Sequence, residues 1–227
     1  MKRLITLTFV ALLVTTTANR VSAQTSVGLR AGLDIARLGP EVDTDSKTGL
    51  LFGVFVGRDF GERLGIQVEL DYSQKGAVTE FLILDVGGGE ATVGDQVIRL
   101  DYIELQVPIV YIIPMENKKV KPRIYAGPTL AFEVSCETEF EEPSGNSVAF
   151  GCEDEIDVGF GPEPAFTRTK TLDFGIVLGV GVELGEGAGA FTADIRLDTG
   201  LTNINEFSPP LIKNRALQLL IGYLRRI

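Results

Sequence analysis

Apolar and polar residues alternate most clearly in Leu64-Gly65-Ile66-Gln67-Val68-Glu69-Leu70-Asp71-Tyr72-Ser73-Gln74-Lys75. Every second residue from Leu64 to Tyr72 is aliphatic or aromatic, and the residues between them are glycine or polar. A β-strand places successive side chains on opposite faces, so this stretch predicts a strand that separates an apolar from a polar environment.

Seven other stretches show the same alternation, which predicts an all-β chain. We expect eight strands, at residues 25–36, 48–58, 63–76, 97–113, 122–135, 169–184, 189–199 and 213–224. The connections between them alternate in length: 59–62, 114–121 and 185–188 are short, whereas 37–47, 77–96, 136–168 and 200–212 are long. Tight turns on one rim and long loops on the other are typical of bacterial outer-membrane barrels.

Parity alone does not say which face points outward, because a soluble ligand-binding barrel with an apolar interior would show the same alternation. Many glycines share the polar parity: Gly28, Gly32, Gly53, Gly57, Gly65, Gly127, Gly175, Gly179, Gly181 and Gly222. Positions without a side chain are needed in a narrow, crowded interior, and strands of ten or more residues match a tilted membrane strand. We therefore expect an eight-stranded antiparallel up-and-down transmembrane β-barrel with its aliphatic side outward.

The expected strand at 97–113 is less regular than the others. Leu100 has the inward parity although it is apolar, and Pro108 removes one hydrogen bond of the ladder. We expect the first third of this strand to project above the bilayer or to contain a bulge, and Pro108 to mark a local bulge.

Residues 1–23 have the three parts of a secretory signal: a basic start, an apolar run from Leu4 to Val14, and the small-residue exit Val21-Ser22-Ala23. The apolar run is too short to cross a bilayer as a helix. We expect cleavage after Ala23, which leaves residues 24–227 as one barrel domain. This mature part has 18 basic against 31 acidic residues, so it should repel nucleic acid and anionic head groups.

The composition disfavours several enzyme classes. The chain has no histidine, which removes the commonest general base and the commonest metal ligand. We therefore expect no catalytic residue, no metal ligand and no cofactor. The two cysteines, Cys136 and Cys152, lie in one segment rich in glycine, serine and acidic residues, and in an oxidising compartment we expect them to form a disulfide that staples this loop.

Several stretches recur in the order and spacing of a known family. They are Val27-Gly28-Leu29-Arg30-Ala31-Gly32-Leu33, Gly53-Val54-Phe55-Val56-Gly57, Gln67-Val68-Glu69-Leu70-Asp71-Tyr72-Ser73-Gln74-Lys75-Gly76, Leu100-Asp101-Tyr102-Ile103-Glu104-Leu105-Gln106-Val107-Pro108, Tyr125-Ala126-Gly127-Pro128, Asp194-Ile195-Arg196-Leu197 and Gly200-Leu201-Thr202-Asn203-Ile204. Over nearly the whole mature chain the sequence resembles the PorT-like, porin-like outer-membrane β-barrel family. The resemblance implies a small integral barrel of the bacterial outer membrane, and a few relatives are linked to protein secretion across it. The end of the chain, Gly222 to Ile227, departs from the family because it lacks a terminal aromatic residue.

The inward parity carries a set of ionised residues: Arg30, Asp34, Glu69, Asp71, Lys75, Glu104, Glu133, Asp173, Glu183, Asp194, Arg196 and Asp198. An eight-stranded barrel is only wide enough for side chains, so we expect these groups to pair with one another or with trapped water, with Arg30 and Arg196 as hubs. Acids outnumber bases, which leaves room for raised pKa values or a bound cation. A proton or cation path, or a catalytic pair such as Glu69 with Asp71, is the alternative to a structural polar plug.

Segment 136–168 contains many carboxylates around the cysteines: Glu137, Glu139, Glu141, Glu142, Glu153, Asp154, Glu155, Asp157 and Glu163. Hard cations prefer oxygen ligands, so this loop could bind calcium or a basic partner, although it has no EF-hand spacing. The alternative is a solvated acidic loop without a ligand. Its prolines and glycines predict no regular structure.

We therefore expect a monomeric, non-enzymatic outer-membrane barrel with a structural role or a surface-interaction role through its long loops. Outer-membrane lipid should surround it, and the barrel-assembly machinery should insert it. The tyrosines could belong to girdles at the membrane interfaces: Tyr72, Tyr102, Tyr111, Tyr125 and Tyr223. The alternatives are a narrow porin for small solutes or ions, a component linked to protein secretion, a lipid-modifying enzyme and a soluble ligand-binding barrel.

Overall fold

The computed structural model describes residues 24–41, 44–83, 92–117, 119–141, 145–152, 154–157, 162–164, 169–206 and 210–227. The expected signal segment, residues 1–23, lies outside this part of the chain. The strands are β1 (Thr25–Pro40), β2 (Asp45–Phe60), β3 (Leu64–Ile83), β4 (Thr92–Gln106), β5 (Ile109–Ile112), β6 (Val120–Glu141), β7 (Ser147–Gly151), β8 (Glu155–Asp157), β9 (Pro162–Pro164), β10 (Leu172–Leu184), β11 (Gly189–Gly200) and β12 (Ile212–Arg226). No helix within the described ranges is long and apolar enough to span a membrane.

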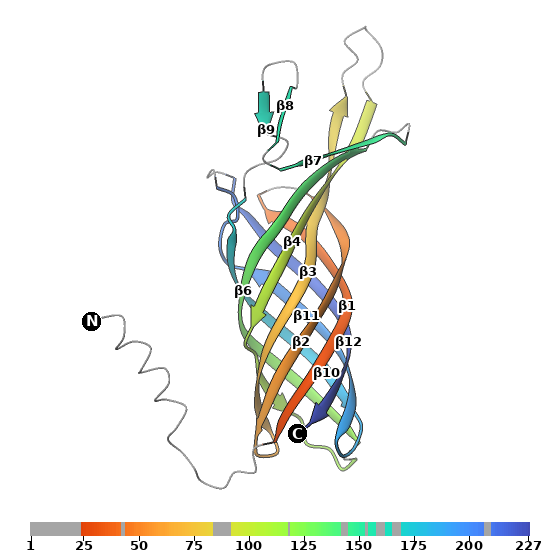
Figure 1. Cartoon of the computed structure of the whole chain (residues 1–227), viewed down its shortest axis with the longest axis vertical. Coiled ribbons are helices and arrows are strands. Elements are labelled where there is room, and N and C mark those ends of the chain that lie inside the picture. Colours follow the sequence, from red (N-terminus) through yellow and green to blue (C-terminus); the bar gives the residue numbers. More distant parts are fainter. Residues whose placement is uncertain are drawn as a thin grey trace, which may run out of the picture.

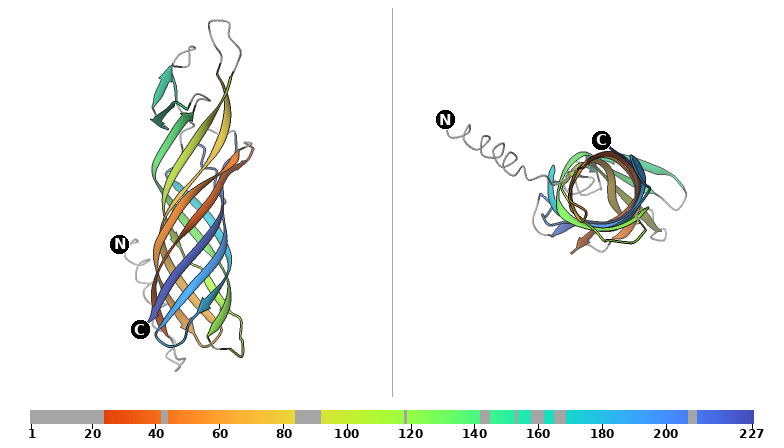
Figure 2. Two further views of the ribbon diagram at one scale, coloured as in Figure 1. Left: turned by 90° about the vertical axis from the view of Figure 1, so that its right-hand side faces the viewer. Right: turned by 90° about the horizontal axis from the view of Figure 1, so that it is seen from below.

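The strands close into a ring with eight strand positions, which we call staves. Each stave pairs antiparallel with its neighbour in the order β10, β11, β12, β1, β2, β3, β4, β6, and β6 pairs back to β10. The short strand β5 continues β4 after Pro108, so the two together form one stave. The first and last strands pair from Ser26 and Arg226 to Pro40 and Ile212, which closes the ring (Figure 1). The end-on view in Figure 2 shows the closed circle, and the predicted eight-stranded barrel is confirmed.

The aliphatic side of the strands faces outward, as predicted. Leu64 is 49% exposed and Val68 is 48% exposed, whereas Glu69, the residue after Val68, is fully buried. We call the exposed apolar side chains around the ring the apolar band; it includes Leu29, Val54, Val68, Leu70, Ile103, Leu105, Phe174, Leu178, Ile195, Leu197 and Ile221. The barrel therefore has an apolar outside and a polar inside over most of its length.

Glycines with the inward parity lie where an inner side chain needs their space. A Cβ atom on Gly53 would overlap the Asp71 carboxylate, and a Cβ atom on Gly179 would overlap the Tyr125 ring. Long side chains thus fill the lumen and pack against the backbone of glycines, which agrees with the crowded interior of a narrow barrel.

Four strands extend well beyond the ring on the side of the long connections. β3 pairs with β4 up to Ile83 and Thr92, β4 pairs with β6 up to Asp95 and Glu141, and β7 adds to β6. We call residues 77–83, 92–101 and 135–141 together with β7 the projecting sheet; it rises past the other strands in Figure 1. The prediction that 77–96 and 136–168 are irregular loops is wrong for these parts.

The polarity of the two faces inverts in the projecting sheet, which explains this error. On β4, the inward Ile98 and Leu100 are buried, whereas the outward Arg99 is exposed and Asp101 is half-buried. The sheet is therefore amphipathic in the opposite sense to the barrel. The first third of the expected strand at 97–113 extends into the projecting sheet, as one of the two predicted alternatives has it. The pairing of β4 with β6 also shifts between Asp101 and Tyr102, but the unpaired residue, Val134, lies on β6 and the alternation along β4 is unbroken.

Candidate functional site: the filled lumen and the projecting sheet

A buried ion-pair cluster crosses the middle of the lumen. Arg30 on β1 lies 2.7 Å from Glu69 on β3 through Nη2 and Oε2, and its Nε donates to Asp71 Oδ1 at 2.9 Å. Arg196 on β11, across the barrel, donates from Nη1 to the same Glu69 oxygen at 2.7 Å and from Nη2 to Oε1 at 3.3 Å. One carboxylate is thus shared by two guanidinium groups, and the bond from Arg196 on β11 to Glu69 on β3 crosses the ring between opposite strands.

Arg196 also fixes an aromatic ring against the cluster. Its Nε donates to the Tyr125 hydroxyl at 2.7 Å, and its guanidinium lies 4.6 Å from the centroid of the same ring. Gln106 accepts a further hydrogen bond from Arg196 at 3.3 Å. Tyr125 is therefore part of the filled lumen, and its suggested place in an interfacial girdle is wrong.

A second cluster lies around Lys75. Its ammonium is 2.6 Å from Glu104 and 2.5 Å from Asp198, and all three side chains are buried. Asp34 lies nearby, and none of the basic side chains in the described ranges contacts it: one of its oxygens accepts from Ser73 at 2.6 Å and from Gln218 at 3.2 Å. Lys75 on β3, Glu104 on β4 and Asp198 on β11 are far apart in the sequence, and the closed ring brings them together.

Two further pairs lie toward the rim of the short turns. Arg123 donates to Asp194 at 2.8 Å and 2.9 Å. Arg226 binds Glu183, which also lies 3.3 Å from the Lys121 ammonium. Burying an ion is costly unless it is paired, so these contacts explain how so many ionised groups fit inside one barrel.

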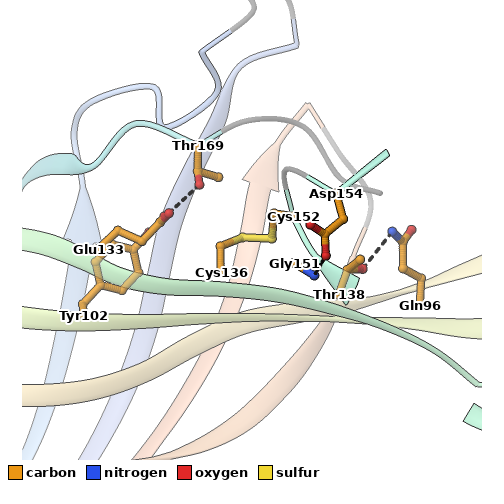
Figure 3. The surroundings of a disulfide bond; sticks show 9 residues. All are labelled: Gln96, Tyr102, Glu133, Cys136, Thr138, Gly151, Cys152, Asp154 and Thr169. Carbon is orange, nitrogen blue, oxygen red and sulfur yellow. Dashed lines mark hydrogen bonds between the residues drawn. A yellow bond between two sulfur atoms is a disulfide. The ribbon is translucent and has the colours of Figure 1, made fainter. Parts of the chain in front are cut away.

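Toward the rim of the long connections, ion pairs give way to carboxylates that are hydrogen-bonded to neutral groups. Asn214 donates to Asp173 at 3.0 Å and to the Tyr102 hydroxyl at 3.1 Å. That hydroxyl donates to Glu133 at 3.3 Å, and Glu133 accepts from Thr169 at 2.7 Å (Figure 3). Tyr102 is fully buried, so its suggested place in a girdle is also wrong.

An apolar layer covers each end of the polar lumen. At the rim of the long connections the layer consists of Leu38, Ala77, Ile98, Leu100, Tyr102, Ala131, Ile204 and Ile212. At the opposite end, Phe55, Ala190 and Leu224 pack together. The ion pairs in the middle of the lumen therefore lie between two groups of packed apolar side chains, whereas Arg226 and Lys121 line a pocket at the rim of the short turns.

The structure places the sequence-predicted residues as follows. Arg30, Asp34, Glu69, Asp71, Glu104, Asp173, Glu183, Asp194, Arg196 and Asp198 are buried on the inward face, and Glu133 is half-buried on it. They form several separate clusters, and no cation-ligand group of three or more acidic or cysteine side chains occurs among the described residues. Sequence reasoning missed the inward position of Arg123, Tyr102 and Tyr125. Gly127 was expected to face inward, and Arg123 and Tyr125 lie four and two positions before it, so the same parity could have placed both inside.

The disulfide joins the two strands of the β6–β7 hairpin. Cys136 on β6 bonds to Cys152, just after β7, with their Cα atoms 5.5 Å apart, and Cys152 N–H donates to the Cys136 carbonyl at 3.2 Å. Figure 3 shows the bond beside Asp154, which accepts from Gly151 N–H at 2.7 Å. The predicted staple is present, although it fastens a hairpin and not an irregular loop.

The acidic side chains of this segment form a row on the outer face of β6. Glu137, Glu139 and Glu141 alternate with the inward Thr138 and Phe140. Glu139 lies 2.7 Å from Arg99 of β4. The side chains of Glu142, Glu153, Glu155, Asp157 and Glu163 lie outside the described part of the chain.

A polar groove of about 310 Å³ marks the level at which the apolar band ends. Lys47, Gln74, Arg99, Asp101 and Glu137 are among the residues that line it. Burial lowers the pKa of the Lys47 ammonium, and the nearby Arg99 lowers it further. The outer surface of the projecting sheet thus begins with charged groups directly above aliphatic ones.

Comparison with known proteins gives a family match over most of the chain. The family model described as outer membrane protein beta-barrel domain matches residues 19–206. No curated protein shows a significant match.

Solved structures with a similar arrangement of strands have little sequence identity to this chain. Neisserial surface protein A is 13% identical, covering 88% of this chain and 97% of its own, with a TM-score of 0.48. Ail, the attachment invasion locus protein of Yersinia pestis, solved with the heparin analogue sucrose octasulfate, is 12% identical, covering 88% and 99%, with a TM-score of 0.41. OprG from Pseudomonas aeruginosa is 9% identical, covering 89% and 95%, with a TM-score of 0.43.

Proposed function

This chain belongs to the outer membrane protein β-barrel domain family, and from that premise we propose that it is a closed, non-catalytic barrel that displays an interaction surface on the cell exterior. It is a protein of the bacterial outer membrane, so its apolar band faces lipid. Long connections of such barrels lie on the extracellular side, and this rule supports an orientation with the projecting sheet outside the cell.

The observation that carries the closed-barrel proposal is the filling of the lumen. Arg30, Glu69 and Arg196 join opposite walls, and packed apolar side chains lie at both ends. A hydrated ion would have to break buried ion pairs, each of which costs about 3–5 kcal/mol to disrupt from one side.

Planar-bilayer recordings test the closed barrel. Purified protein should insert without discrete channel openings, whereas a porin measured in the same bilayers should open. Discrete openings that scale with the amount of this protein would overturn the proposal in favour of a narrow porin.

The interaction surface is supported by charge and shape. The projecting sheet stands clear of the apolar band, and its outer face carries the row Glu137, Glu139 and Glu141. A row of carboxylates on a stapled hairpin favours a basic partner. Protease added to intact cells should cleave between β6 and β10; protection of this region in intact cells would contradict the assigned orientation.

Finer features of the proposal rest on the sequence. We propose that residues 1–23 are removed after Ala23, that the assembly machinery for outer-membrane barrels inserts residues 24–227, and that the barrel is a monomer. The ordered motifs, such as Leu100 to Pro108, support placement in the PorT-like subgroup, and through it a link to protein secretion is a further candidate role. Mass spectrometry of the exported protein would test the cleavage site directly.

A further inference from the structure

The outer edge of β7 pairs with no other strand among the described residues. Within those ranges β7 pairs with β6 on one side, and β8 and β9 form a separate two-stranded sheet. Natural sheets usually protect such edges with charged residues, proline or bulges. Ser147-Val148-Ala149-Phe150-Gly151 has no charged residue and no proline.

The hydrogen-bond pattern shows which backbone groups of this edge are available. Cys152 bonds to its partner Cys136, and in an antiparallel pair hydrogen-bonded and non-bonded positions alternate. Val148 and Phe150 therefore bond to β6, whereas the N–H and C=O groups of Ser147 and Ala149 point away from it. Gly151, which shares their direction, is already bonded to Asp154 (Figure 3).

The two faces beside this edge differ in chemistry. On the outer face, Ser147, Ala149 and Gly151 lie opposite Glu141, Glu139 and Glu137 of β6, so small side chains separate the edge from a row of carboxylates. On the inner face, Phe150 packs edge-on against Phe140 with ring centroids 6.2 Å apart, and Val148 is exposed beside them. An added strand would thus meet carboxylates on one face and apolar groups on the other.

We propose that the free edge of β7 binds an extended peptide segment in which basic and apolar residues alternate, added antiparallel as a further strand of the projecting sheet. Main-chain hydrogen bonds to Ser147 and Ala149 provide the attachment, and the side-chain pattern provides the selectivity. The inference rests on the proposed function, because it names the class of partner that the projecting sheet takes.

The geometry allows the basic side chains to reach the glutamates. Neighbouring strands are about 4.8 Å apart, so an added strand lies about 10 Å from β6. Lysine and arginine can extend across the small residues of β7 toward Glu139 and Glu141, while the intervening apolar residues pack beside Val148 and Phe150. A second copy of this chain fits less well, since its β7 carries no base and its own glutamate row would repel the first.

The test uses the full mature barrel in lipid nanodiscs and a fluorescent Lys-Val-Lys-Val-Lys-Val-Lys peptide. In the antiparallel register, the lysine amides point toward β7 and the valine amides point away. N-methylation of the lysine amides should therefore weaken binding at least tenfold, whereas N-methylation of the valine amides should leave it within twofold. An alternating Glu-Val peptide should not bind.

Variants test the same edge from the protein side. Ala149→Pro removes an edge N–H without removing a bond to β6, and should weaken peptide binding at least tenfold, whereas Ala149→Ser should bind like the wild type. The triple variant E137Q/E139Q/E141Q should weaken binding and abolish its salt dependence. Because the methylated peptides probe the wild-type protein, a misfolded variant does not remove the test.

The outcomes separate this inference from the proposed function. Equal binding of both methylated peptides, or no binding of the unmodified peptide, overturns edge pairing. Binding that depends on the glutamates but not on the lysine amides also overturns it, yet leaves an acidic surface for basic partners. Channel openings in planar bilayers would instead overturn the closed barrel, whatever the peptides do.

Discussion

At the scale of single residues, Glu69 is the group on which the lumen depends most. It is fully buried and pairs with both Arg30 and Arg196; Arg30 also pairs with Asp71, whereas Glu69 is the carboxylate that contacts Arg196. Glu69 thus links strands on opposite sides of the barrel, and a substitution at this position breaks that link.

Replacing this carboxylate should destabilise the barrel strongly. In Glu69→Gln, Arg196 keeps Tyr125 and Gln106 but has no ionised partner within contact, so we expect a loss of about 3–5 kcal/mol in the free energy of unfolding. The control Glu62→Gln, at an exposed turn, should change it by less than about 0.5 kcal/mol. Urea unfolding in detergent micelles measures both, and equal stability of the two variants would show that Glu69 is not a structural hub.

At the scale of elements, β4 shows how one strand serves two environments. Its outward row changes from Leu105 and Ile103 in the apolar band to Asp101 and Arg99 in the projecting sheet, and its inward row changes in the opposite sense, from Glu104 to Leu100 and Ile98. The inversion requires no change in backbone conformation, only in the order of residues along the strand.

A matched pair of arginine substitutions on β4 tests where the lipid boundary lies. Leu105→Arg puts a charge into the apolar band, a short way inside its boundary, and should cost about 1–2 kcal/mol, between the values at the interface and at the midplane. Val97→Arg, on the same face beside Glu139, should be tolerated within about 0.5 kcal/mol. Folding yield and unfolding in lipid vesicles measure the difference; an intolerant position 97 would place the projecting sheet in the membrane.

The disulfide belongs to the β6–β7 hairpin and not to the ring. Closing a loop of this length, with a sequence separation of 16, stabilises the closed form by about 3 kcal/mol in the chain-entropy model. Reduction should therefore increase proteolytic cleavage between residues 137 and 154 while the eight-stranded ring stays protected, and the variant C136S/C152S should be cleaved equally with and without reductant. Cleavage that reductant leaves unchanged would show that the staple does not hold the hairpin.

The elements also show how far sequence reasoning reaches. Periodicity located all eight staves and the outward face, because a repeat of two is the direct signature of a two-sided strand. It fails where polarity inverts: the expected strand at 97–113 includes Ile98 and Leu100, but the expected connections include residues 77–83, 92–96 and 136–141, which are parts of β3, β4 and β6. It also could not pair Lys75 with Glu104 and Asp198, because the register and stagger that bring three strands together are set by the closed ring.

At the scale of the whole molecule, the surroundings of the side chains change along the barrel axis, both inside the lumen and on the outer surface. Apolar layers lie at both ends of the lumen, ion pairs fill the middle, lipid surrounds the apolar band, and water surrounds the projecting sheet. The filled lumen, the lipid-facing band and the projecting sheet all follow from the way apolar and polar residues alternate along the strands and from the inversion of that alternation in the projecting sheet. The central claim is that the outer surface changes from lipid-facing to water-facing within β4, between Ile103 and Asp101.

Spin labels along the outer face of β4 test that claim most directly. Single cysteines would be introduced at positions 97, 99, 101, 103 and 105, with the native disulfide intact, and collision rates with oxygen and with a water-soluble nickel chelate would be measured in lipid vesicles. We predict that oxygen dominates at 103 and 105 and that the nickel chelate dominates at 97, 99 and 101. Equal access of the nickel chelate to position 105 and position 99 would contradict the account, because the aliphatic face would then lie in water.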